Sequence, residues 1–225
     1  MVLLSGTEGR HAAVVRRLRS GERIEVGDGA GLVASCVVTK VNGGELELAV
    51  QARRQVPRPR PVITVIQAIP KGDRGELAVE EMTEVGVDKI IPWAAERSVP
   101  LWRDGKGAAR WRARAREAAK QAERPWIPEV CAPVSTAAAA SLVAAAQLTV
   151  LLTPGGADPL ALVTPPPEGE LIVIVGPEGG ISPAEIEAIM AAGARPYRLG
   201  PSVLRTSTAG AVAAALLLSR TSRWA

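Results

Sequence analysis

Short runs of alternating apolar and polar residues fill the first part of the chain. Between residues 23 and 51 the alternation has the period of two that is typical of strands with one buried face. It predicts strands at Arg23–Val26, Gly31–Lys40 and Glu45–Gln51, and a short helix before them at Arg10–Arg19. The turns Gly27-Asp28-Gly29 and Asn42-Gly43-Gly44 separate the strands as hairpin turns do. This pattern predicts a small β-rich module of about 55 residues, too small to be very stable alone.

Prolines alternate with other residues in the stretch RRQVPRPRP at 53–61. Proline has no backbone N–H, so this stretch favours an extended chain with few ladder hydrogen bonds. We therefore divide the chain into a module at 1–56, a proline-rich linker at 57–61 and a second domain at 62–225.

Apolar runs of strand length alternate with helix-length stretches after the linker. The predicted strands are Val62–Ala68, Lys89–Trp93, Leu148–Thr153, Leu171–Val175 and Tyr197–Leu199. The predicted helices are Gly75–Val85, Arg110–Arg124, Thr136–Ala146, one that starts at Ser182, and Thr208–Leu218. Such alternation is typical of an α/β domain with a mainly parallel sheet.

The stretch from residue 171 to 222 carries the most specific chemistry. An apolar strand runs into GPEGG at 176–180, and a helix follows with Ser182 as N-cap, Pro183 at its first position and Glu185 completing a capping box. A second strand then meets GPSVLRT and a last helix that is apolar nearly all round, which must be buried on most of its surface. Two glycine-bearing turns thus follow strands at the edge where open α/β sheets bind ligands.

The composition narrows the class of protein. Apolar residues make up 47% of the chain, but there is no Phe and one Tyr, so Val, Leu, Ile and Ala must form the core. No apolar run reaches the roughly 18 residues of a membrane span, and the opening MVLLSGTEGR is too soon polar for a signal peptide. Cys36 and Cys131 give neither a disulfide framework nor a metal spacing. These features predict a reduced, cytoplasmic protein that binds no metal.

The excess of positively charged residues lies outside the half of the chain that contains GPEGG. Residues 1–60 hold 10 Lys and Arg against 6 Asp and Glu, and residues 101–127 hold 8 against 3. Residues 131–225 hold 5 against 6. This distribution is expected if an RNA-binding surface lies beside a pocket for a small ligand.

GPEGG taken alone fits two structures, a plain strand–helix turn and a turn whose backbone approaches a ligand. LGPSVLRT, and LTPGG at 152–156 after another strand, favour the second, because three strand-end loops can enclose a pocket. A phosphate loop is excluded, since neither GPEGGIS nor TPGGADP has the Lys and hydroxyl pair of a Walker motif, and G-x-G-x-x-G is absent.

The words GPEGGIS at 176–182, AEIEAIMAAGA after it, LGPSVLRT at 199–206 and the closing TAGAVAAALLL occur in a specific order. Fainter matches include HAAVVRRLRSGE and residues 66–93. The chain here resembles the RsmE family of the SPOUT superfamily. Those enzymes use S-adenosylmethionine to methylate N3 of a uridine in 16S ribosomal RNA, and S-adenosylhomocysteine is the product.

The resemblance implies a PUA-like RNA-binding β-barrel at the N-terminus, a trefoil knot from about residue 148 onward, a homodimer, and 16S ribosomal RNA within the small ribosomal subunit as partner. It leads us to expect more residues before HAAVVRRLR, so either a first barrel strand is missing or the start is misassigned. It also places the cofactor on residues Leu152, Thr153, Pro154, Gly176, Pro177, Glu178, Gly179, Gly180, Leu199, Gly200, Val203, Leu204, Arg205, Thr208 and Ala209.

Arg205 is the main candidate for catalysis. Uridine N3 is protonated at neutral pH, and a fixed guanidinium can stabilise the negative charge that develops on O2 or O4, or hold an RNA phosphate. The alternative is a structural cap of the last helix. Glu178 is a candidate base, with a backbone hydrogen bond as its alternative role. The family often has Arg where Ser202 stands and Glu where Ser207 stands, so no role is carried over to either.

Basic residues outside the pocket are candidates for RNA contact, with a solvated surface as the alternative. The candidates are His11, Arg16, Arg17, Arg19, Lys71, Arg74, Arg110, Arg112, Arg114 and Arg116. Two other functions stay open: a SPOUT methyltransferase that acts on ribose 2′-OH or on tRNA, and a noncatalytic RNA-binding ribosome-assembly factor.

Overall fold

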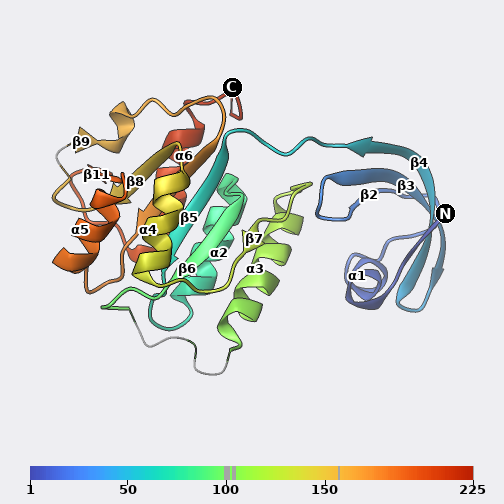
Figure 1. Ribbon diagram of the computed structural model, residues 1–225. Coiled ribbons are helices and arrows are strands. Elements are labelled where there is room, and N and C mark those ends of the chain that lie inside the picture. Colours follow the sequence, from blue (N-terminus) through green and yellow to red (C-terminus); the bar gives the residue numbers. More distant parts are fainter. Residues whose placement is uncertain (99–101, 103–104, 157, 225) are drawn as a thin grey trace. The chain divides into compact units, whose positions relative to one another are not determined.

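The computed structural model describes residues 1–98, 102, 105–156 and 158–224 (Figure 1). Contacts between residues divide the chain into two compact units, Met1–Arg58 and Pro59–Ala225. None of the described helices is long and apolar enough to span a membrane.

The first unit is an antiparallel sheet packed against a short helical segment. Its elements are β1 (Val2–Leu4), α1 (Gly6–Arg10), a π-helical turn (His11–Val15), β2 (Arg23–Gly27), β3 (Leu32–Asn42) and β4 (Glu45–Gln55). The four strands lie in the order β1-β4-β3-β2. Residues before HAAVVRRLR therefore do supply a strand, because β1 pairs with β4 from Val2 opposite Leu48 to Leu4 opposite Leu46.

Two predicted boundaries in this unit are wrong. The helix expected at Arg10–Arg19 begins at Gly6 and ends by Val15, and Arg17 takes a left-handed φ of 53° just after it. The start of this helix was not predicted because glycines, which are poor helix formers, lie in it. Packing requires a glycine at position 9, because a Cβ there would lie 2.5 Å from the Leu4 carbonyl oxygen. The ladder of β4 also continues through residues 52–55 opposite β3, so the stretch with few ladder bonds begins later than predicted, where the prolines begin.

The second unit is an α/β domain, as predicted. Its strands are β5 (Val62–Ala68), β6 (Lys89–Trp93), β7 (Glu129–Val130), β8 (Leu148–Leu152), β9 (Asp158–Pro159), β10 (Glu170–Val175) and β11 (Arg195–Arg198). Its helices are α2 (Arg74–Val85), α3 (Gly107–Gln121), α4 (Thr136–Ala145), a 3₁₀ turn (Leu160–Leu162), α5 (Pro183–Ala191) and α6 (Thr206–Leu218). The strands form one sheet in the order β7-β6-β5-β10-β8-β11-β9, and every pairing is parallel.

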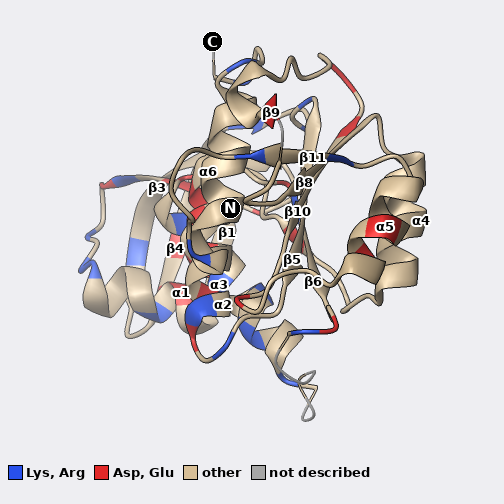
Figure 2. Cartoon of the chain, turned by 90° about the vertical axis from the view of Figure 1, so that its left-hand side faces the viewer, with Lys and Arg blue, Asp and Glu red and all other residues tan. Residues whose placement is uncertain are grey.

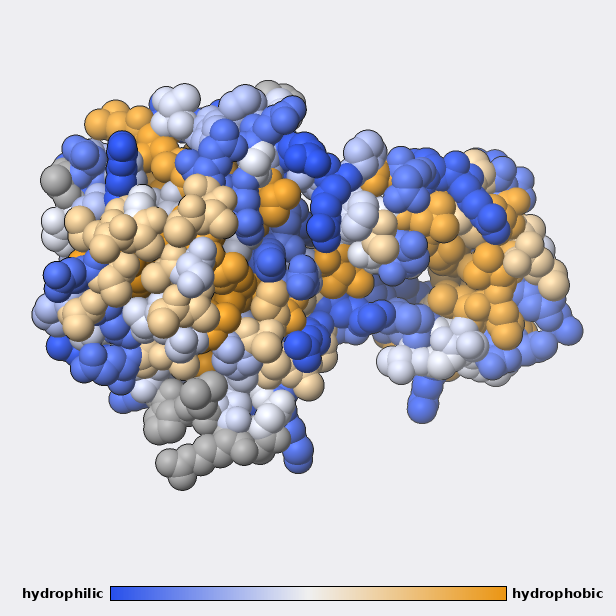
Figure 3. Space-filling view, in the orientation of Figure 1, coloured by the Kyte–Doolittle hydropathy of each residue, from blue (hydrophilic) through white to orange (hydrophobic). Residues whose placement is uncertain are grey.

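Helices cover both faces of this sheet. Figure 2 shows α4 and α5 on one side and α2, α3 and α6 on the other. Strand β5 contributes side chains to the cores on both faces of the sheet. Ile63 and Val65 pack in the core under α2 and α6. Ile66 and Ala68 pack in the core under α4 and α5. Burial on both faces explains why apolar residues in this strand do not alternate with exposed polar ones. The face of α4 and α5 has a mildly apolar surface (Figure 3), as expected from the alanines of α4.

The ends of the helices place the loops that follow the strands. The predicted capping box of α5 is present, with Ser182 Oγ accepting from the N–H of Glu185 and Glu185 Oε2 accepting from the N–H of Ser182. Helix α6 begins at Thr206 rather than at the predicted Thr208, with Arg205 as N-cap. It is buried against α2, β5 and β10 of its own chain, and only a stripe of Thr208, Val212, Ala215 and Leu216 is half-exposed.

A buried ion cluster fastens the C-terminal residues to the sheet. The Asp88 carboxylate accepts from both terminal nitrogens of Arg223, at 2.6 and 3.2 Å, and lies 3.5 Å from Arg124. Arg223 also donates to the carbonyls of Pro61 and Gly86, at 2.9 and 2.8 Å. Burial lowers the pKa of Arg124, and the charge of Asp88 opposes this shift.

Candidate functional site

The three predicted loops lie together at the carboxyl edge of the parallel sheet. Strand β8 lies between β10 and β11 and pairs with both. Ile174 is opposite Leu151, and Tyr197 is opposite Leu152. The turns that follow, at 153–156, 176–180 and 199–205, therefore leave the sheet at the same level. This is the edge at which open α/β sheets bind ligands.

Hydrogen bonds fix these loops to themselves and to the elements beside them. The N–H of Gly180 donates to the Pro177 carbonyl at 2.9 Å, and Gly180 has a φ of 76°, which closes the GPEGG turn. Thr206 Oγ1 donates to the Gly176 carbonyl at 3.2 Å, which ties this turn to the start of α6. In the loop after β8, the N–H of Thr153 donates to the carbonyl of Tyr197 at 3.0 Å. The GPEGG turn is thus tied to the start of α6, and the loop after β8 is tied to strand β11.

Glycines give these loops two different properties. A Cβ at Gly176 would lie 2.5 Å from Cγ1 of Ile181, and a Cβ at Gly156 would overlap the backbone of Tyr197, so both are required by packing. A Cβ at Gly155 or Gly200 would meet nothing within 4 Å, and one at Gly180 would meet only Arg97, at 4.0 Å. Each loop therefore carries a glycine whose Cβ position is open, and the backbone there is accessible to a ligand.

The loop at 199–205 is exposed and largely apolar. Val203 is 79% exposed and Leu204 is 36% exposed, and the side chain of Arg205 is exposed as well. The Arg205 carbonyl accepts from the N–H groups of Thr208 and Ala209, each at 3.0 Å, so its backbone caps α6 while its guanidinium faces solvent. This arrangement fits both the catalytic and the capping interpretation of Arg205.

Glu178 makes the backbone contact that we considered as its alternative role. Its Oε1 accepts from the N–H of Lys71 at 3.4 Å, which links GPEGG to the loop after β5. Lys71 therefore lies in a loop beside the GPEGG turn. Arg74 is the first residue of α2.

Two supports beside the GPEGG turn were not predicted from the sequence: a contact of Arg97, which was not singled out, and further contacts of Glu185, which was named only for its capping box. Arg97, which follows β6, donates to the Gly179 carbonyl at 3.2 Å, and its Cβ lies 3.2 Å from a Cβ placed at Gly179. Among the described residues no carboxylate pairs with Arg97. Glu185 accepts from the N–H of Glu96 at 2.9 Å and from Thr136 Oγ1 at 2.8 Å. No motif in the sequence pairs residues 97 and 179, so only the fold reveals this contact.

The environment of Glu185 favours its ionised form. Burial alone raises the pKa of its carboxyl group, but hydrogen bonds from Glu96, Thr136 and Ser182 outweigh burial and lower the pKa below the ordinary value. A charged carboxylate therefore fastens the loop after β6 to the start of α5, next to the GPEGG turn.

The basic candidates on α3 are largely engaged by neighbouring residues. Arg110 pairs with Glu76 at 3.1 Å and Arg114 pairs with Glu80 at 3.4 Å, while Arg112 donates to the Val130 carbonyl at 3.0 Å. Arg116 is exposed. In the first unit, Arg16, Arg17 and Arg19 are exposed and His11 is half-buried. An arginine paired to glutamate on its own surface has less free charge for phosphate, which weakens the interpretation of α3 as an RNA-binding helix.

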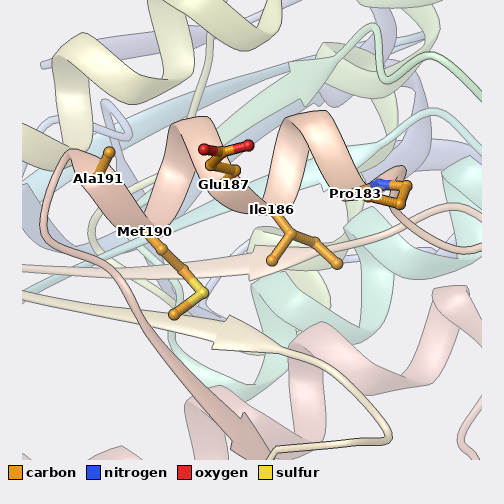
Figure 4. Close-up of a pocket in the computed structure, with 5 residues that line it drawn as sticks. All are labelled: Pro183, Ile186, Glu187, Met190 and Ala191. Atoms are coloured by element: carbon orange, nitrogen blue, oxygen red, sulfur yellow. The ribbon is translucent and has the colours of Figure 1, made fainter.

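Two shallow depressions lie away from the three loops. One is lined by a single helix, α5, through Pro183, Ile186, Glu187, Met190 and Ala191 (Figure 4). The other lies between α3 and β7 and includes Arg112 and Arg116. Neither includes a residue of the loops at 153–156 or 199–205. Within the described part of the chain, no group of three or more His, Cys, Asp or Glu could hold a metal ion.

Comparisons with known proteins agree with this geometry. The model of the RNA methyltransferase domain family matches residues 57–218, and that of the RNA methyltransferase PUA domain matches residues 4–51. The ribosomal RNA small subunit methyltransferase E of Mycobacterium bovis is 44% identical over 231 residues, covering 100% of this chain and 88% of its own. The Bacillus subtilis protein of the same name is 29% identical and covers 92% of this chain and 85% of its own.

Solved structures support the same assignment. A methyltransferase E of Neisseria gonorrhoeae, bound to S-adenosylmethionine, has a TM-score of 0.85 at 28% identity, covering 97% of this chain and 91% of its own. A Legionella pneumophila structure with the same cofactor has a TM-score of 0.86 at 30% identity, covering 98% and 92%. The predicted resemblance is confirmed: this chain belongs to the ribosomal RNA small subunit methyltransferase E family, with a PUA domain before its methyltransferase domain.

Proposed function

We propose that this protein transfers the methyl group of S-adenosylmethionine to N3 of a uridine in the decoding region of 16S ribosomal RNA. The observation that carries the proposal is the carboxyl edge of the sheet, where three neighbouring loops each present a glycine whose Cβ position is open. Membership of the family supplies the substrate class, and relatives solved with S-adenosylmethionine supply the cofactor.

The residues of this edge fit the cofactor. Adenine and ribose need a shallow apolar surface with exposed backbone donors, and the exposed Val203 and Leu204 lie in the same loop as the open position at Gly200. The loops at 152–154 and 176–180 would supply the facing walls, and Thr208 and Ala209 the floor at the start of α6. The bound cofactor would supply a methyl group on a positively charged sulfur.

In this proposal the chain's own residues orient the base and handle charge. The N3–H bond of the uridine would break, so a proton must leave and negative charge develops on O2 and O4. N3 would then take the methyl group as the bond between that group and the cofactor sulfur breaks, which leaves S-adenosylhomocysteine. The exposed Arg205 guanidinium would stabilise that charge, a contribution of about 10²- to 10³-fold in rate for one well-placed donor. Glu178 remains a candidate proton acceptor, and its hydrogen bond with the Lys71 N–H would orient the carboxylate.

RNA docking would use both units. We assign the module at residues 1–56 to RNA binding through its exposed Arg16, Arg17 and Arg19, and the linker at 57–61 would connect it to the methyltransferase domain. Near the cofactor loops, Arg97, Lys71 and Arg74 form no ion pair with a described carboxylate. They are therefore stronger candidates for phosphate contact than the paired Arg110 and Arg114 of α3.

We also propose how the protein assembles and how its chain is threaded. The half-exposed stripe of α6 and the exposed Val203 would be covered by a second copy, in a homodimer that completes the site. We also propose that the chain from about residue 148 onward forms a trefoil knot. Work on the small ribosomal subunit would place the protein in the cytoplasm.

Methyl transfer from labelled S-adenosylmethionine to small ribosomal subunits and to naked RNA tests the proposal. We expect N3-methyluridine as the product. A different methylated nucleoside, such as a 2′-O-methyl ribose, would refute the assigned atom. No transfer and no cofactor binding would refute the enzyme and favour an assembly factor.

A further inference from the structure

One buried amide lies among apolar side chains in the core of the sheet, at Gln67 of strand β5. The side chain of Gln67 is fully buried, on the face of β5 that α2 and α6 cover. A buried amide destabilises a core unless hydrogen bonds satisfy it, and Met or Leu would fill the same space without this cost. The presence of Gln67 therefore calls for an explanation in its contacts.

The contacts of Gln67 lead to the first residue of α6. Its Nε2 donates to the carbonyl of Thr206 at 3.3 Å and to the carbonyl of Ala68 at 3.1 Å. Both partners are acceptors, so the opposite orientation of the amide would set Oε1 against two carbonyl oxygens and is disfavoured. Gln67 Oε1 has no hydrogen-bond partner among the described residues, which adds to the cost of the amide.

Thr206 carries the connection onward to the GPEGG turn. Its backbone carbonyl accepts from Gln67, and its hydroxyl donates to the carbonyl of Gly176 at 3.2 Å. Gln67 and Gly176 lie at the ends of adjacent strands, since Gln67 is opposite Val175 in the pairing of β5 with β10. One residue of α6 is therefore held by two strands at once.

The held residue directly follows Arg205, the N-cap of α6. Residues 200–205 of this loop are exposed, and Thr206 is the buried residue that follows them. Close packing of α6 on β5 supports this attachment, because a Cβ at Gly210 would lie 3.3 Å from Gln67 Oε1 and 3.0 Å from Met82 Sδ. Any shift of Thr206 would move Arg205 relative to the GPEGG turn.

We infer that Gln67 is a positioning residue for methyl transfer: through Thr206 it fixes Arg205 and the loop before α6 against the GPEGG turn. Gln67 touches neither the cofactor nor the RNA in this account. A displacement of about 1 Å in a positioned group can cost a hundredfold in rate, so a loss between tenfold and a hundredfold in kcat/KM is expected without it.

The test uses two substitutions that keep the side-chain volume. Gln67→Met removes the hydrogen bond to the Thr206 carbonyl, and Thr206→Val removes the hydrogen bond to the Gly176 carbonyl. We expect each to lower kcat and to raise the Kd for S-adenosylmethionine, while the Kd for RNA stays within about twofold of wild type. The double variant should lose no more activity than the worse single variant, because the two bonds act in series through residue 206. Thr206→Ser keeps the hydroxyl and should retain nearly full activity.

Thr149→Val is the matched control. Thr149 is a buried residue of the same sheet, and its hydroxyl has no hydrogen-bond partner among the described residues, so its removal should leave activity and melting temperature unchanged. A purely structural Gln67 would give Gln67→Met a lower melting temperature with wild-type kinetic constants per folded molecule, and that result would overturn the inference. If Gln67→Met does not fold, equal activity of Thr206→Val and Thr206→Ser would overturn it as well.

This inference rests on the proposed function of the loops, and the two can fail separately. A wild-type protein without methyl transfer would refute the proposed function. An active wild-type protein with fully active Gln67→Met and Thr206→Val variants would refute only the role of Gln67.

Discussion

The Asp88 cluster gives the sharpest prediction about stability. The change is Arg223→Met, which removes the guanidinium but keeps much of the apolar stem. It deletes the contacts of Arg223 with Asp88 and with the carbonyls of Pro61 and Gly86. The side chains of Arg223 and Asp88 are 10% and 6% exposed, so solvent can replace little of what is lost.

The expected loss in the free energy of unfolding depends on the contacts that Asp88 keeps after the change. Removing one partner of a buried ion pair costs about 3–5 kcal/mol, because the other charge stays buried without compensation. Asp88 keeps Arg124 at 3.5 Å and the Ile63 N–H at 2.9 Å after the change, so we expect the lower end, about 3 kcal/mol. Asp88→Asn should lower the free energy of unfolding by at least as much, because it leaves the buried guanidinium groups of Arg124 and Arg223 to repel each other.

Urea unfolding followed by tryptophan fluorescence measures this loss in the second unit alone, because all five tryptophans lie after residue 58. The control is Arg114→Met, which breaks an ion pair with Glu80 whose side chains are 43% and 38% exposed. Such an exposed pair is worth less than about 1 kcal/mol. Equal losses for Arg223→Met and Arg114→Met would refute the reasoning that burial makes the cluster strong.

Four further outcomes follow from the structure. Gly156→Ala should raise the Kd for S-adenosylmethionine, measured by calorimetry, because the new Cβ would overlap the backbone of the adjacent strand; unchanged binding would contradict this. Glu185→Gln should destabilise the fold at neutral pH. Because the folded pKa of Glu185 is lowered, its contribution is present above the ordinary value of 4.5 and is lost as pH falls through the lower folded value, so the stability gap to wild type should narrow below about pH 4.5. Arg97→Gln should raise the KM for RNA, while Arg195→Gln, the same charge change at the amino end of β11, should not. Burial and the charge of Glu129 raise the pKa of Cys131 to about 11, so its alkylation by iodoacetamide should stay slow at pH 8 and accelerate toward pH 11.

Local patterns in the sequence predicted those parts of the fold that are determined locally. The capping box of α5 and the apolar run of β5 depend on neighbours in the chain, and both were found. The start of α1 was missed because glycines stand where good helix formers are expected, and Gly9 is required by a contact with the distant Gly44.

The sequence could place the main loops of the candidate site together, but it could not reveal the contacts that support them. Motifs after parallel strands meet at one edge by the geometry of the sheet, so GPEGG and LGPSVLRT could be placed together from sequence. Contacts of Arg97 with Gly179 and of Gln67 with Thr206 join residues 82 and 139 positions apart, and no local pattern encodes them. Charge counts also overstated the positive charge that α3 can offer to RNA. They do not reveal that Glu76 and Glu80 of α2 form ion pairs with arginines of α3.

The most direct test of the account is methyl transfer to small ribosomal subunits by wild type, Arg205→Ala and Arg220→Ala, with the product nucleoside identified. Arg220 is an exposed arginine after α6 and controls for the loss of charge. The account predicts N3-methyluridine from wild type and from Arg220→Ala, and a rate about 10²- to 10³-fold lower for Arg205→Ala. Full activity of Arg205→Ala, or a product other than N3-methyluridine, would contradict it.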